Sequence, residues 1–108
     1  MRRLHGSRRR PAGAILRRAA LVGCGRNVTT IEGLGAGALQ RLFLEEQAAQ
    51  CGFCTNGIIL SLAALLQRDP PASRAEIIAH LDERHLCRCG AQPRILRVVD
   101  RALTERVA

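Results

Sequence analysis

Two closely spaced cysteine pairs constrain this chain of 108 residues more than any other feature. Two residues separate Cys51 from Cys54, and a single residue separates Cys87 from Cys89. A C-x2-C pair held in a turn can place two thiolates on the edge of one metal ion or cluster, whereas the C-x-C spacing is less usual for structural zinc. A fold that brought the two pairs together would create a site with four thiolates.

Helical patterns surround both pairs. Apolar spacing predicts helices over about 38–50 and 56–68, and the second is apolar on nearly all sides, which is typical of a central, buried helix. Ser73 and Glu76 have the spacing of a capping box that begins a third helix, and Pro93 suits the first turn of a fourth. We therefore predict an all-α four-helix bundle, built from two helix–loop–helix units with a cysteine pair in each inner loop.

The cysteine pairs also stand close to predicted helix starts. Cys54 precedes the second helix and Cys89 the fourth, and helix N-termini offer unpaired N–H groups and positive potential to an anionic cluster. Gly52 and Gly90 would let the backbone approach the sulfur atoms closely. The residues leave three interpretations open: an iron–sulfur cluster, a four-thiolate zinc site in a helical interaction module, and disulfides or inert thiols. A disulfide framework fits poorly with five cysteines and no clear secretory signal.

The net charge of +8 belongs to the start of the chain. Residues 1–26 contain arginines and no acid, whereas the remaining basic and acidic residues balance. We therefore expect a basic leader over 1–25, disordered or misassigned, and a helical domain over 26–108, with no nucleic-acid partner. No stretch approaches the roughly 20 apolar residues of a membrane span. Arg17 and Arg18 interrupt the apolar run that a signal peptide needs, so we expect a cytoplasmic protein.

Three motifs in order resemble the small iron–sulfur subunits of the xanthine dehydrogenase, or molybdenum hydroxylase, family. They are VTTIEGL at 28–34, QAAQCGFCTNG at 47–57 and LCRCG at 86–90. The resemblance is to subunits of the isoquinoline oxidoreductase and nicotinate dehydrogenase type. It extends from residue 26 to about residue 103 and concerns the C-terminal helical domain of those subunits.

The resemblance implies a [2Fe–2S] cluster with Cys51, Cys54, Cys87 and Cys89 as its ligands. It also implies that Gln50 and the region of Cys89 face the molybdopterin of a large partner subunit, which this chain contacts but does not hold. The chain would transfer electrons from that molybdenum centre towards a cytochrome or flavin acceptor. It would contain no catalytic site of its own.

The sequence also departs from the family pattern. Asn56 stands where most relatives have Pro, and Glu83-Arg84-His85 replaces the usual Gly-Asn, with His85 expected to face solvent rather than to bind a metal. Relatives begin with a plant-type ferredoxin domain, and Cys24 alone cannot rebuild its four-thiolate site. We therefore expect residues 1–25 to be a frame-shifted or misassigned start. The alternatives to electron transfer are a zinc-stabilised helical interaction module and a non-functional fragment that lacks the ferredoxin domain.

Overall fold

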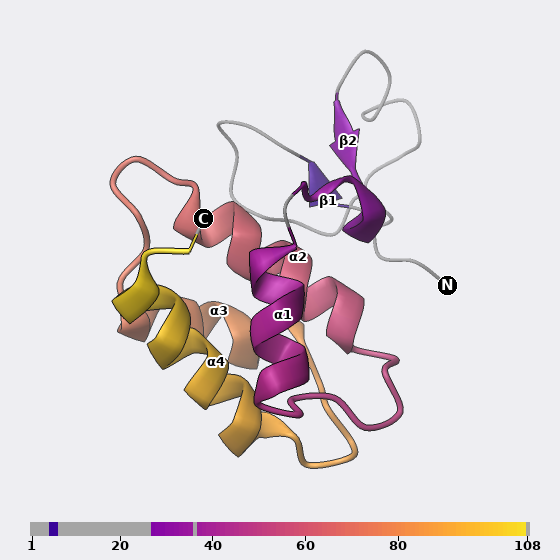
Figure 1. The fold of residues 1–108 in the computed structure, drawn as a ribbon. Helices are drawn as coiled ribbons and strands as arrows, with labels where there is room; N and C mark the ends of the chain where they lie inside the picture. Colours follow the sequence, from indigo (N-terminus) through magenta and orange to yellow (C-terminus); the bar gives the residue numbers. More distant parts are fainter. Residues whose placement is uncertain (1–4, 7–26, 36, 108) are drawn as a thin grey trace.

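The computed structural model describes residues 5–6, 27–35 and 37–107. Within them lie four α-helices, which confirms the predicted all-α class: α1 (Ala38–Glu45), α2 (Thr55–Leu66), α3 (Arg74–Arg84) and α4 (Gln92–Glu105). None of these helices is long and apolar enough to cross a membrane. Figure 1 shows them as one bundle, with α1 beside α4.

Before α1 the described residues form two short strands and one 3-10 helix. Strand β2 (Val28–Thr29) pairs antiparallel with β1 (His5–Gly6), and the 3-10 helix η3 (Ile31–Gly33) follows. Apart from β1, the predicted basic leader lies outside the described residues. Its disorder and the domain boundary at residue 26 therefore stay predictions.

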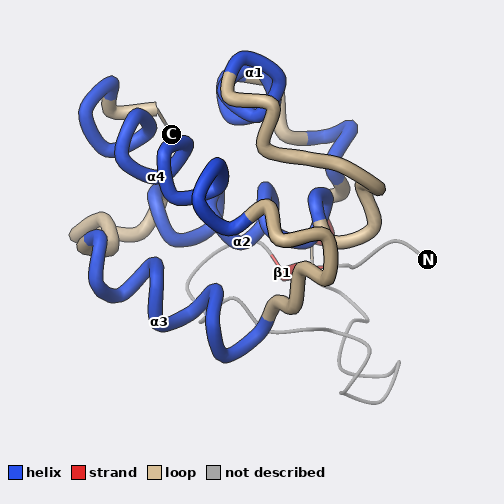
Figure 2. The backbone as a smooth tube through the Cα atoms, turned by 90° about the horizontal axis from the view of Figure 1, so that it is seen from below, coloured by secondary structure: helices blue, strands red, loops and turns tan. Residues whose placement is uncertain are grey.

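Helix α2 forms the centre of the bundle, as its apolar sequence predicts. Nine of its residues are buried, and Leu62 is completely so. Helices α1, α3 and α4 lie around it (Figure 2). A helix that is apolar on nearly every side is stable in water only when neighbours cover all of those sides. The other helices provide that cover together with β1 and η3, which also contact α2.

Helix α1 ends at Glu45, five residues before the predicted end at Gln50. Gln47 adopts a left-handed conformation with φ of 49°. Its N–H donates to the Leu44 carbonyl at 3.1 Å, and the Ala48 N–H donates to the Phe43 carbonyl at 2.9 Å. This is a Schellman ending, in which glycine usually takes the left-handed position. The early end leaves residues 46–54 as the loop that carries the first cysteine pair.

The starts of α3 and α4 agree with the predictions. The Ser73 N–H donates to the Glu76 carboxylate at 2.7 Å, and the Glu76 N–H donates to Ser73 Oγ at 3.3 Å, so the capping box is complete. Pro93 lies in the first turn of α4. Both starts therefore follow from local sequence signals.

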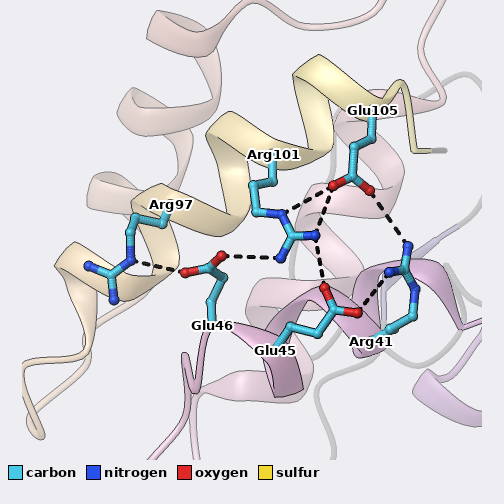
Figure 3. Close-up of polar contacts among 6 residues, drawn as sticks. All are labelled: Arg41, Glu45, Glu46, Arg97, Arg101 and Glu105. Atoms are coloured by element: carbon cyan, nitrogen blue, oxygen red, sulfur yellow. Dashed lines mark hydrogen bonds and ion pairs between the residues drawn. The ribbon is translucent and has the colours of Figure 1, made fainter.

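Ion pairs join α4 to the C-terminal part of α1 and the residue after it (Figure 3). Arg101 is at their centre and pairs with Glu45 at 2.8 Å, Glu46 at 3.1 Å and Glu105 at 2.9 Å. The hydrogen bond from Arg41 is the largest cause that lowers the pKa of Glu45, and the one from Arg101 is the second. The pKa of Glu46 is lowered most by the hydrogen bond from Arg97 and next by the one from Arg101.

We predict that Arg101→Gln makes the protein less stable at pH 7 and less sensitive to acid. Carboxylates with a lowered pKa in the folded state stabilise it above their unfolded pKa, and this contribution disappears as the pH falls through the folded pKa. The urea midpoint of the variant should therefore lie below that of the wild type at pH 7, and the gap should narrow towards pH 3. Arg106→Gln, which removes the same charge from an exposed position at the end of α4, is the control. A gap of equal size at both pH values would contradict the prediction.

Candidate metal centre

The two cysteine-bearing loops, 46–54 and 85–91, meet at the same end of the bundle (Figure 1). The Cys51 thiol lies within hydrogen-bonding reach of the Cys89 thiol, and the Cys54 thiol within reach of the Cys87 thiol. Each contact therefore joins one thiol from each loop. All four cysteines are free of disulfides.

One contact lies at the surface and the other lies below it. Cys51 and Cys89, which we call the outer pair, are exposed. Cys54 and Cys87, the inner pair, are 8% and 9% exposed and belong to the hydrophobic core. The site thus extends from the surface of the bundle into its interior.

The start of α4 contributes backbone donors to the inner pair. The Cys87 sulfur accepts hydrogen bonds from the N–H groups of Ala91, Cys89 and Gly90, where Ala91 is the N-cap residue of α4. The hydrogen bond from Ala91 is the largest cause that lowers the pKa of Cys87. The N-cap residue of α4 thus approaches one of the four thiols, that of Cys87.

Cys54 is in a different electrical environment. It is itself the N-cap residue of α2, and its side chain makes no capping hydrogen bond. Burial, followed by the neighbouring Cys87 thiol, raises the pKa of Cys54 to about 11. The backbone N–H of Phe53, followed by the Cys89 thiol, lowers the pKa of Cys51. Metals bind thiolates, so a cation at this site would take the place of the Cys54 proton.

Glycines follow both members of the outer pair. Gly52 has φ of 79° and Gly90 has φ of 76°, which is the left-handed region that other residues rarely adopt. A Cβ atom at either position would meet no atom of the chain within 4 Å. The left-handed backbone therefore accounts for glycine at both positions, and at Gly90 the backbone N–H also approaches the Cys87 sulfur, as expected.

The other residues of these loops are mostly exposed. Gln50 lies at the surface next to Cys51, and Arg88 at the surface between Cys87 and Cys89. Phe53 and Leu86, each next to an inner cysteine, are both 77% exposed. Each of the two loops therefore presents one large apolar side chain at the surface.

The expectation that His85 faces solvent is wrong. His85 is half-buried, and its Nε2 lies 2.7 Å from Oγ of Ser61 in the middle of α2. The backbone of His85 is extended at the end of α3, and this turns the imidazole towards α2. His80 lies in α3, five residues before His85, and its ring centroid is 6.4 Å from that of His85.

Ser61 belongs to no motif that the sequence reveals. It is completely buried and is the only buried polar residue of the part of the chain that the structure describes. The available signal was a single polar residue within the apolar run 57–66, because a buried polar group needs a hydrogen-bond partner.

The arrangement of the thiols fits a cluster with two metal atoms. The thiols form two contacts, each between one cysteine of either loop. A [2Fe–2S] cluster needs four thiolates, two for each iron. Four cysteine thiolates are the donors that an iron–sulfur cluster requires.

Comparison with known proteins agrees with this class. Residues 30–100 match the family described as the [2Fe-2S] binding domain. The chain therefore belongs to that family. The match includes both loops and all four helices except the last turns of α4.

Similar proteins include components of three oxidising enzymes. The chain is 50% identical over 86 residues to one of the subunits of nicotinate dehydrogenase from Pseudomonas putida, covering 76% of this chain and 54% of the relative. It is 46% identical over 83 residues to the alpha chain of isoquinoline 1-oxidoreductase from Brevundimonas diminuta, covering 74% and 54%. It is also 33% identical over 99 residues to an aldehyde oxidoreductase iron-sulfur-binding subunit of Escherichia coli O157:H7, covering 75% and 43%. The chain thus spans about half the length of these relatives.

We predict that the thiols of the metal-free protein differ in reactivity, with Cys51 alkylated first and Cys54 last. Cys51 is exposed and its pKa is lowered, so near pH 8 it carries more thiolate than Cys54, which is buried and has a raised pKa. Timed reaction with iodoacetamide, followed by peptide mass mapping, measures the order. In urea, which unfolds the protein, the thiols should react at similar rates. Equal rates for the folded protein would contradict the arrangement.

Proposed function

We propose that this chain transfers electrons through a [2Fe–2S] cluster held by Cys51, Cys54, Cys87 and Cys89. The observation that carries the proposal is the meeting of these four thiols, from two separate loops, at one end of the bundle. Membership of the [2Fe-2S] binding domain family supports it. When bound, such a cluster takes up and releases one electron at a time.

The chain's own groups would tune that exchange. The Cys87 sulfur accepts backbone N–H groups at the start of α4, and hydrogen bonds to cluster sulfurs are among the factors that set the reduction potential. Donors of this kind favour added negative charge. The core around the inner pair has the opposite effect, because burial disfavours charge. The potential would therefore reflect a balance between the dipoles at the start of α4 and the apolar core.

The proposed partner is a large molybdopterin-binding subunit. Two relatives are named as subunits of nicotinate dehydrogenase and isoquinoline 1-oxidoreductase, enzymes of more than one subunit. We propose that the partner docks over the outer pair, where Phe53 and Leu86 are exposed, with Gln50 facing the pterin. Electrons would continue to a cytochrome or flavin acceptor. Substrate oxidation itself would take place on the partner, and this chain would have no catalytic residue.

We predict that the full chain, reconstituted without oxygen from iron and sulfide, becomes coloured and binds about two iron and two sulfide per chain. Serine at any of the four site cysteines should reduce iron content severalfold and change the visible spectrum. Cys24→Ser, a change of the fifth cysteine, is the matched control and should load like the wild type. A colourless protein that binds zinc stoichiometrically would refute the cluster and favour a zinc-stabilised helical module.

We predict that Phe53→Ser and Leu86→Ser each weaken binding of the loaded chain to the large subunit by about tenfold or more, because buried aromatic and apolar anchors dominate interfaces. Both variants should retain the absorption spectrum of the cluster. Val28→Ser, which alters an exposed apolar residue in β2, is the control. Co-purification and titration calorimetry measure the affinities. Unchanged binding by both loop variants would exclude this end of the bundle as the interface.

A further inference from the structure

A buried hydrogen bond connects the central helix to the loop that carries the second cysteine pair. Ser61 Oγ lies 2.7 Å from His85 Nε2. Ser61 is completely buried in α2, and His85 follows the last residue of α3. The bond therefore joins the interior of the bundle to the residue two positions before Cys87.

The geometry of both segments makes this bond relevant to the inner pair. Ser61 is seven residues after Cys54, which is about two helical turns, so both side chains lie on the same side of α2. His85 is extended, with φ of −131° and ψ of 127°. In extended backbone, alternate side chains point the same way. The burial follows that alternation, because His85 and Cys87 point inwards and Leu86 is 77% exposed.

The two segments therefore meet at two matched points. Ser61 contacts His85, and one step nearer the surface Cys54 contacts Cys87. On its other side, the Cys87 carbonyl accepts a hydrogen bond from Gln92 Nε2 at 3.1 Å, which ties it to the start of α4. Cys87 is thus anchored to α4 on one side, and the Ser61–His85 bond is the anchor to α2 on the other.

We propose that Ser61 and His85 are a positioning pair that sets the place of Cys87 opposite Cys54. This inference rests on the proposed function, because it concerns the inner half of the cluster site. Neither residue of the pair would bind the cluster, and both would act through Cys87. Loss of His85 leaves the buried Ser61 hydroxyl without this hydrogen bond, and loss of Ser61 removes the bond that holds His85 against α2. In either case the segment that carries Cys87 would move.

The test compares Ser61→Ala and His85→Leu with the wild type, all as the reconstituted full chain. We expect both variants to shift the electron paramagnetic resonance g values of the reduced protein and its visible circular dichroism. We also expect both variants to lose iron to a chelator about fivefold to tenfold faster than the wild type. A change of this size corresponds to the free energy of one buried hydrogen bond. The double variant should be no worse than the worse single one, because both changes remove the same contact.

Two further variants separate positioning from general destabilisation. His85→Gln keeps an amide near the place of Nε2 and should restore the spectra and the rate of iron loss. Leu44→Gln changes a leucine of α1 that is 78% exposed, and should leave both unchanged. If Ser61→Ala and His85→Leu lower the urea midpoint but keep wild-type spectra and iron loss, the pair is merely structural and the proposal is wrong. If the wild type itself takes up no cluster, the proposed function fails, and the role of the pair fails with it.

Discussion

The burial of α2 is the constraint on which the rest of this structure depends. A helix with apolar side chains on nearly every side must be enclosed, and α1, α3 and α4 enclose it. In a bundle whose consecutive helices alternate in direction, the first and third connections lie at one end and the second lies at the other. Loops 46–54 and 85–91 are the first and third connections. The need to cover α2 thereby brings distant cysteines together before any metal contributes.

The site built on this frame combines opposing electrical influences. Backbone N–H groups lower the pKa of Cys51 and of Cys87, whereas the core raises that of Cys54. Four thiolates close together repel one another, and the buried one is the most costly to ionise. Without a bound cation, burial therefore favours the protonated form of Cys54. The fold supplies the positions of the donors, and cations would supply the remaining stabilisation.

Much of this could be predicted from sequence, because the relevant signals are local. The capping box at Ser73, the proline at the start of α4 and the continuous apolar face of α2 all have short-range physical causes. The ending of α1 was predicted wrongly because Gln47 takes a left-handed position that glycine usually marks.

The error at His85 has a different origin. Its partner, Ser61, is 24 residues away and on another helix. No local sequence pattern predicts such a contact. A histidine between charged residues and a cysteine motif is typical of a solvated loop. The tertiary fold alone decides which side of the extended segment turns inwards, and with it the side on which both His85 and Cys87 lie.

The division of the thiols into an outer and an inner pair has a consequence for assembly. A protein that covered this end of the bundle would remove water from Cys51 and Cys89, while Cys54 and Cys87 are already dry. Docking would thus change the dielectric environment of one half of the site and leave the other half nearly as it was. Association itself would then act as an electrical control, because the solvation of the outer pair, and with it the energy of an added charge, depends on whether a partner is in place.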